Sequence, residues 1–501
     1  MPARVANGTE HRSASPSRKA NGVHSPATTA TTATTAASPS RSRSRSPARS
    51  KTASTVTATT ATSVTTVAAA ASSDATLVKS HKKEKYVARK SRLDSTLDPP
   101  IGDDQFRGFH NLFGLGLAFF VVTKAADNLM KEGSPIEHDV LDTISRNLKE
   151  MFGAVLSVAG LAMLPVVFQK MIVARLIPQV LQIILHTALI LSMLIVAPLL
   201  CIRFELGFTQ SVYVIVETCV LVMKAHSYLA SNRQFHAEAA HPDSSTNAAD
   251  VSRKSVVYPQ NVTLKNYLMY LLYPTLVYEL EYPRTSRVRH GYVLLKFVQF
   301  WCSFFFLYFV VSHYYMPVLE EHATDAYKNL TPLAQFVYNL HTVSRLIMPM
   351  LFCHGLFFYI IFECVLNFFA EVTRFADREF YEDWWNATSF EEYARKWNKP
   401  VHDFLLRYLY LGSIRSLRMS RRSATFATFL ISSIIHEMVL AVSLRVFSPY
   451  LFILQMSQLL WIYLFRQWKG LVYGNLFVWF GLIIGPPMLS LAYAREYYNT
   501  Q

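Results

Sequence analysis

Long apolar runs dominate the chain from residue 109 onward and are separated by short polar segments. A helix needs about 20 residues to cross the hydrocarbon core of a bilayer, and the runs have about that length. We predict an all-α polytopic membrane protein with about nine transmembrane helices. The predicted spans are residues 109–130, 151–169, 178–200, 210–227, 290–316, 347–370, 424–446, 449–467 and 472–494.

The first hundred residues lack this pattern. They are rich in Ser, Thr, Ala, Pro and Arg and contain few large apolar side chains. Such a segment cannot bury enough apolar surface to offset its conformational entropy. We therefore divide the chain into a disordered basic tail, residues 1–100, and a membrane domain, residues 101–501.

Charge is distributed very unevenly along the chain. Of the formal net charge of +15, residues 1–92 contribute most, because they hold 16 Lys and Arg against 3 acids. The membrane domain is left nearly neutral, so we expect no nucleic acid partner. The short Arg-Ser repeat at 41–50 also occurs in RNA-associated proteins, but a phosphorylated tail or one that contacts anionic lipid fits a membrane protein better.

Basic residues beside the spans predict the orientation of the chain, since Lys and Arg are retained on the cytoplasmic side. Residues 374–422 contain ten of them, whereas residues 317–344 contain only Lys328. We expect the N-terminal tail and the 374–422 connection in the cytosol and the C-terminus on the far side. The glycosylation sequon at Asn329 would then face the lumen, and the one at Asn386 would not.

The five cysteines lie singly in apolar stretches without a CxxC pair. We therefore expect no disulfide framework. The spacing of His, Cys and carboxylate residues suggests no metal site either.

Residues 424–446 place His436 and Glu437 near the middle of a predicted span. A charged side chain at that depth costs about 2.5 kcal/mol or more, so it usually has a functional reason. The alternative is a neutral histidine bonded to a neighbouring helix. Ser432 lies one turn before His436, whereas Glu437 lies about 100° around the helix and should not form a dyad with it.

Residues 375–410 are dense in aromatic and basic side chains. One interpretation is an amphipathic helix lying on the headgroups, because Trp and Tyr favour bilayer interfaces. The other is a binding surface on which an anionic ligand meets basic groups. The basic groups in question are Arg395, Lys399, His402 and Arg422.

These two segments resemble a known family. FYEDWWN, at Phe380–Asn386, is similar to the FYxDWWN signature of the sterol and diacylglycerol branch of the membrane-bound O-acyltransferases. His436-Glu437 resembles the intramembrane histidine of that family, and Tyr273–Thr285 resembles its partner motif. The motif residues are Phe380, Tyr381, Asp383, Trp384, Trp385 and Asn386.

The resemblance implies a nine-span enzyme of the endoplasmic reticulum, a dimer or tetramer, with a reaction chamber inside the bilayer. It implies that His436 and Asn398 are catalytic, that acyl-CoA is a substrate, and that no cofactor is needed. The acyl-CoA contacts that it implies are Arg395, Trp397, His402, Tyr410, Arg422 and Ser432.

The acceptor alcohol is harder to predict. Diacylglycerol enzymes of the branch carry Gln after a Gly in the last span, whereas this chain reads Gly485-Pro486-Pro487, more similar to fungal sterol acyltransferases. We expect a membrane sterol as acceptor, with diacylglycerol as the alternative. A transporter with a buried histidine relay is a remote third hypothesis, because the sequence shows no internal repeat.

Overall fold

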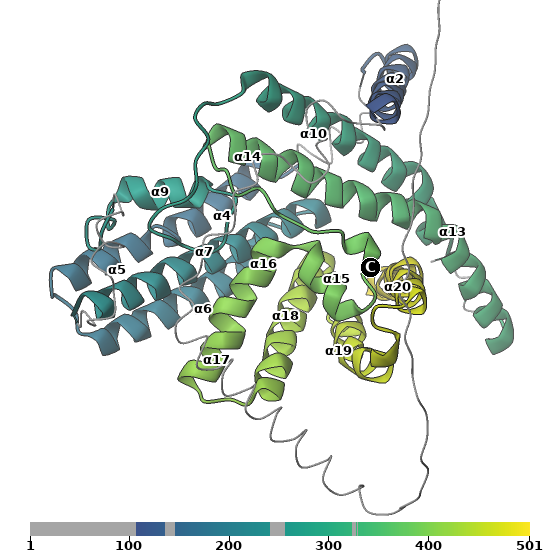
Figure 1. Ribbon diagram of the computed structural model, residues 1–501. Coiled ribbons are helices and arrows are strands. Elements are labelled where there is room, and N and C mark those ends of the chain that lie inside the picture. Colours follow the sequence, from purple (N-terminus) through teal and green to yellow (C-terminus); the bar gives the residue numbers. More distant parts are fainter. Residues whose placement is uncertain (1–106, 136–145, 241–255, 323–326, 328, 501) are drawn as a thin grey trace, which may run out of the picture. The chain divides into compact units, whose positions relative to one another are not determined.

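The computed structural model describes residues 107–135, 146–240, 256–322, 327 and 329–500 (Figure 1). The predicted tail, residues 1–100, lies outside the described residues. Helices make up most of the described chain. Their bounds are α2 (Arg107–Glu132), α4 (Leu148–Leu161), α5 (Leu164–Val173), α6 (Gln179–Arg203), α7 (Phe208–Ala240), α9 (Leu264–Leu272), α10 (His290–Val310), α11 (Met316–His322), α13 (Pro332–Phe358), α14 (Leu366–Val372), α15 (Phe390–Trp397), α16 (Lys399–Phe404), α17 (Leu411–Ser416), α18 (Arg421–Leu444), α19 (Tyr450–Leu464) and α20 (Val472–Thr500).

Three π-helical turns and two short 3-10 helices complete the described secondary structure. The π-helical turns are η1 (Val311–Tyr315), η2 (Tyr359–Val365) and η4 (Leu405–Tyr410), and the 3-10 helices are η3 (Trp384–Asn386) and η5 (Arg466–Trp468). Because η1 and η2 join helices without a break, α10 to α11 and α13 to α14 each run as one continuous helical segment.

Seven helical segments in the described part of the chain are long and apolar enough to cross a bilayer. Many of their apolar side chains are exposed, for example Ile184 and Ile195 on α6. A surface of this kind suits lipid rather than water. The prediction of an all-α, multi-pass membrane protein is therefore confirmed.

The predicted count of nine spans is not confirmed. The predicted span 109–130 corresponds to α2, whose apolar run is interrupted by Lys124 and Asp127 and which is not among the seven. The predicted span 449–467 corresponds to α19, which has only 15 residues. At 1.5 Å per residue this helix reaches about 22 Å, less than the thickness of the hydrocarbon core.

The described residues between the predicted spans 290–316 and 347–370 are also largely helical. The helical segment that contains the predicted span 347–370 begins at Pro332 and has 41 residues. Thr331 caps its first turn by accepting a hydrogen bond from the Ala334 N–H, and Pro332 follows at a position where the missing N–H has no cost. These local signals outweigh the polar composition of the segment.

Helices α4, α6 and α7 pack against one another. Ala154, Val158 and Ala197 are buried there together with Met193. Helix α18 packs against the same group through Met438 and nearby valines. Helix α18 also contacts α19, and α20 contacts α13, so the later helices are joined to the earlier ones.

Residues 375–389 link α14 to α15 with little helix, so a single amphipathic helix over 375–410 is not observed. Ser389 caps α15 by accepting a hydrogen bond from the Glu392 N–H. Asn398 caps α16 in the same way, accepting from the Val401 N–H. Two caps within ten residues explain why the segment breaks into short helices.

Gly474, near the start of α20, touches this segment. A Cβ atom at this position would lie 2.4 Å from the Thr388 carbonyl oxygen and 2.5 Å from the Trp468 carbonyl oxygen. Both are backbone atoms and cannot swing aside. Only glycine allows α20 to approach the segment this closely.

We expect Gly474→Ala to destabilise the protein by about 1–3 kcal/mol, because overpacking forces the backbone to shift. The thermal unfolding midpoint of the purified protein would measure the effect. Gly485→Ala on the same helix is the control, since its Cβ would have only an ordinary contact at 3.8 Å. Equal midpoints for the two variants would contradict the close-approach argument.

Candidate active site

His436 lies on α18 with its side chain exposed. Its Nδ1 atom is 2.8 Å from the carbonyl oxygen of Ser432, one turn earlier. A carbonyl oxygen only accepts, so Nδ1 carries the proton and donates it, and the lone pair is left on Nε2. This tautomer is the one that a general base needs.

Glu437, the next residue, is buried and points elsewhere. Its Oε1 accepts a hydrogen bond from the Tyr493 hydroxyl at 2.6 Å, and its Oε2 accepts one from the Phe452 N–H at 2.8 Å. The carboxylate thus joins α18 to α19 and α20. As helix geometry predicted, Glu437 does not form a dyad with His436.

Asn398 stands between α15 and α16 and is half-buried. Its Oδ1 atom is engaged as the cap of α16, at 3.2 Å from the Val401 nitrogen. The cap fixes the amide plane and leaves the Nδ2 hydrogens as donors.

No hydrogen bond between described residues joins Asn398 to His436 directly. The two are related through η4, which continues α16 along the chain and packs against α18. Tyr410 is the last residue of this turn and is half-buried. Arg407 in η4 pairs with Glu279, which fixes the turn to the segment after α9.

The predicted acyl-CoA residues lie in different environments. Arg395 is half-exposed and 3.6 Å from Glu382, and His402 Nδ1 is 3.5 Å from the Asp403 carboxylate. Arg422 is exposed in the first turn of α18. Ser432 contributes its carbonyl oxygen to His436, as described above.

Lys399 does not fit the predicted anion-binding surface. Its ammonium group is buried and lies 2.9 Å from Glu379 and 2.6 Å from Glu382. Two carboxylates already neutralise it, so its role is to hold the loop that precedes η3 against α16.

The aromatic residues of the FYEDWWN motif are buried or half-buried, whereas Asp383 and Asn386 are exposed. Tyr381 donates a 2.5 Å hydrogen bond to Glu363 on η2, and Glu363 pairs with Lys296 on α10 at 3.3 Å. Phe380 is buried beside them. The backbone carbonyl of Trp385 accepts hydrogen bonds from the Asn475 side chain and from the Trp479 indole, so the motif is also fixed to α20.

Trp384 and Trp397 belong to one aromatic cluster, with ring centroids 4.8 Å apart in an edge-to-face arrangement. Trp397 also stacks on His354 at 4.5 Å, which connects the cluster to α13. The predicted ligand residue Trp397 thus has a packing role immediately before Asn398.

Ion pairs connect the motif to α15. Lys396 lies 2.9 Å from Asp383 and 2.8 Å from Glu392. The hydrogen bond from Lys396 lowers the pKa of Asp383. Burial opposes the charged form of Glu392, but hydrogen bonds from Lys396 and Thr388 prevail and lower its pKa to about 2. Asn386 donates to Asp383 at 3.3 Å and completes the set.

The partner motif, Tyr273–Thr285, begins beside a buried lysine. Lys224 on α7 donates to the carbonyl oxygens of Tyr270, Leu271 and Tyr273, at distances of 3.1, 3.0 and 2.6 Å. These carbonyls lie at the C-terminal end of α9, where donors from the next helical turn are missing. The lysine therefore fixes the motif to a spanning helix.

The sequence reasoning did not single out Lys224, Lys296 or Glu363. A signal was available, because each is an ionisable residue inside a predicted or observed span. In the described part of the chain no group of three His, Cys, Asp or Glu side chains could hold a metal ion.

The described chain is thus a helical membrane domain that presents His436 on a spanning helix. Residues 155–495 match the model of MBOAT, the membrane-bound O-acyltransferase family, so the chain belongs to this family and is an O-acyltransferase.

Three relatives show how the similarity is distributed. "Probable sterol O-acyltransferase 2" of Schizosaccharomyces pombe is 32% identical over 77% of this chain and 87% of its own length. "Sterol O-acyltransferase 1" of Saccharomyces cerevisiae is 32% identical over 59% of this chain and 54% of its own length. "Diacylglycerol O-acyltransferase 1C" of Glycine max is 29% identical over 80% of this chain and 78% of its own length.

We expect His436→Ala to abolish ester formation and to leave thermal stability unchanged, because the exposed ring has its one described hydrogen bond within α18. Glu437→Gln should do the opposite. The glutamine amide has one acceptor oxygen, so either the Tyr493 hydroxyl or the Phe452 N–H would lose its acceptor. This loss should cost about 1–3 kcal/mol in stability, while the folded fraction of the variant keeps its turnover. Turnover and unfolding midpoints of both variants test this contrast. Equal loss of turnover in both would show that the residues act as a unit.

Asn398→Ala should lower turnover by roughly 10²-fold, the scale seen when one oxyanion donor is removed. Asn398→Asp is the matched control, since a carboxylate still caps α16 but offers no N–H. If capping alone mattered, Asn398→Asp would keep normal turnover. A change confined to the apparent affinity for the acyl donor would assign Asn398 to binding.

Proposed function

We propose that this enzyme transfers a fatty acyl group from acyl-CoA to the hydroxyl of a membrane sterol and forms a steryl ester. The observation that carries the proposal is His436, whose protonated Nδ1 is held by Ser432 while Nε2 is available as a base. The similarity to sterol O-acyltransferases over most of the chain supports the choice of acceptor.

In the proposed reaction, His436 Nε2 removes the hydroxyl proton of the sterol as its oxygen attacks the thioester carbonyl carbon. The Nδ2 group of Asn398 donates a hydrogen bond to the oxyanion that forms. The carbon–sulfur bond then breaks, and the coenzyme A thiolate recovers the proton from the imidazolium. General base catalysis of this type contributes about 10²- to 10⁴-fold.

A thioester is already activated, so no covalent enzyme intermediate and no cofactor are needed. Arg395, His402 and Arg422 would meet the phosphates of acyl-CoA, and Tyr410 would lie beside the pantetheine arm. Trp397 and Ser432 would contribute indirectly, by placing Asn398 and His436. The exposed guanidinium of Arg422 in the first turn of α18 supports this assignment.

The proposal places the enzyme in the membrane of the endoplasmic reticulum, with the N-terminal tail in the cytosol. We further propose that the enzyme forms a homo-oligomer, either a dimer or a tetramer. Acyl-CoA would then enter from the cytosol, and the sterol would enter laterally from the bilayer.

Diacylglycerol is the second candidate acceptor, because a diacylglycerol O-acyltransferase matches 80% of the chain. Its two ester groups would need polar partners in the chamber. Pro486 within α20 offers no side-chain donor, and its carbonyl oxygen accepts a hydrogen bond from Ser490 at 2.9 Å. An unpaired ester costs about 1–3 kcal/mol, which favours the sterol.

We expect the purified enzyme to prefer ergosterol or cholesterol over diacylglycerol by at least about tenfold, corresponding to one unpaired ester group. Labelled acyl-CoA, with the three acceptors assayed in parallel at matched concentrations, would measure the preference. Pro486→Gln alone should not reverse it, since chamber shape also contributes. Faster formation of triacylglycerol than of steryl ester by the wild-type enzyme would establish the second candidate instead.

A further inference from the structure

Two segments far apart in the sequence bring five arginines together. Residues 283–289 precede α10, and residues 371–378 comprise the end of α14 and the chain that follows it. An isolated antiparallel bridge pairs Arg284 with Phe375, and the Thr285 N–H donates to the Arg374 carbonyl at 2.9 Å. We call the following residues the arginine cluster: Arg284, Arg287, Arg289, Arg374 and Arg378.

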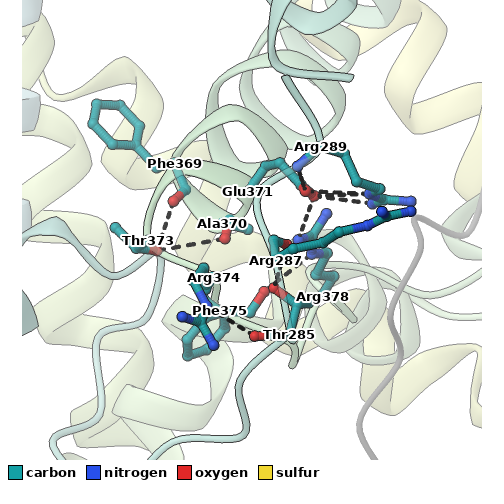
Figure 2. Close-up of polar contacts among 10 residues, drawn as sticks. All are labelled: Thr285, Arg287, Arg289, Phe369, Ala370, Glu371, Thr373, Arg374, Phe375 and Arg378. Atoms are coloured by element: carbon teal, nitrogen blue, oxygen red, sulfur yellow. Dashed lines mark hydrogen bonds and ion pairs between the residues drawn. The ribbon is translucent and has the colours of Figure 1, made fainter. Parts of the chain in front are cut away.

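A single buried carboxylate holds two of these arginines. Glu371 accepts from the Arg289 backbone N–H at 2.7 Å and from its Nη2 at 2.9 Å. Arg378 Nη2 lies 2.7 Å from the same carboxylate, and its side chain is fully buried. Figure 2 shows this arrangement, with the side chains of Arg287 and Arg289 extending in the same direction.

Positive charge exceeds negative charge in this region. Residues 284–289 and 371–378 contain five arginines and two acids, Glu371 and Asp377. Arg378 Nη1 is buried without a hydrogen-bond acceptor among the described residues. Nor does any acidic side chain in the described chain pair with Arg284, Arg287 or Arg374. The Nε group of Arg374 donates to the Thr285 carbonyl at 2.9 Å.

The arginine cluster lies where two spanning helices leave the bilayer. One span begins at His290 and another ends at Val372, directly beside the cluster. Leu294 and Val372 are exposed apolar side chains within about one turn of it, so this side of the helices faces lipid. The ring of Tyr292 lies 4.5 Å from the Arg289 guanidinium and separates the charges from the apolar surface.

We propose that the arginine cluster binds the phosphate-bearing headgroup of an anionic phospholipid. Arginine presents a planar fork of donors that matches phosphate oxygens, and a guanidinium desolvates more readily than an ammonium group. The exposed Arg284 and Arg287 would contact the phosphate. The Glu371 clamp would hold the backbone that presents them, and the acyl chains would lie along α10 and α14.

The phosphate could instead come from a soluble molecule, such as acyl-CoA or inorganic phosphate. Two observations favour lipid: the cluster adjoins lipid-facing side chains, and the described hydrogen bonds and ion pairs do not connect it to His436, Asn398 or Arg395. The experiment therefore compares these sources.

The full-length enzyme in detergent micelles would be titrated with phosphatidic acid or phosphatidylcholine and the bound lipid counted by native mass spectrometry. The wild type should prefer phosphatidic acid. The double variant Arg284→Gln and Arg287→Gln should lose roughly fivefold in that preference for each arginine. Among the described residues no hydrogen bond or ion pair joins these two side chains to Glu371, so the unfolding midpoint should not change.

Two control variants sharpen the result. Arg175→Gln removes an exposed arginine that follows another span and should keep the preference. Arg284→Lys with Arg287→Lys keeps the charge but not the fork, so it should retain part of the preference.

The proposal fails if the double glutamine variant binds phosphatidic acid as the wild type does, or if Arg175→Gln loses the preference equally. It also fails if inorganic phosphate at equal concentration displaces the lipid, which would indicate a site for free anions. A raised KM for acyl-CoA with unchanged lipid binding would assign the arginine cluster to the acyl donor.

Discussion

The hydrogen bond from Tyr381 to Glu363 connects the segment that carries Asn398 to the membrane helices. Glu363 and its partner Lys296 are both buried within spanning segments, where a lone charge would be costly. Removing one partner of such a pair typically costs about 3–5 kcal/mol, because the other charge is left uncompensated. With Tyr381 fixed, Trp384 and Trp397 pack against α13, and Trp397 leads directly to Asn398.

The residues that identify the family and the residues proposed for its chemistry are therefore different groups with different roles. The aromatic side chains of FYEDWWN are mostly buried, and the Asp383 carboxylate and the Trp385 carbonyl are engaged by neighbouring segments. The motif connects η2, α15 and α20. His436 and Asn398 instead each leave one side-chain nitrogen unengaged by the hydrogen bonds described for them. The motif makes many contacts with neighbouring segments and holds the framework in place. His436 and Asn398 therefore need only a few contacts each.

The sequence predicted the spans well where one apolar run formed one helix, as in α6 and α18. It failed where length or capping decided the outcome, since α19 is apolar but short and the cap at Thr331 starts α13 early. Helical periodicity correctly separated His436 from Glu437. Periodicity could not predict the partners of buried charges, because Lys296 and Glu363 are 67 residues apart and Arg289 and Glu371 are 82 apart. The sequence shows that such charges are costly, but only the fold shows how they are paired.

Helix α18 shows how one element meets two opposing demands. The buried carboxylate of Glu437 needs hydrogen-bond donors, and it receives them from Phe452 on α19 and Tyr493 on α20. His436 must keep one nitrogen open to a reactant, and its other nitrogen bonds to Ser432 within the same helix. Adjacent residues on a helix point about 100° apart, so the two environments do not interfere. Glu437 thus joins α18 to its neighbours on one face of the helix, while the imidazole of His436 is presented on another.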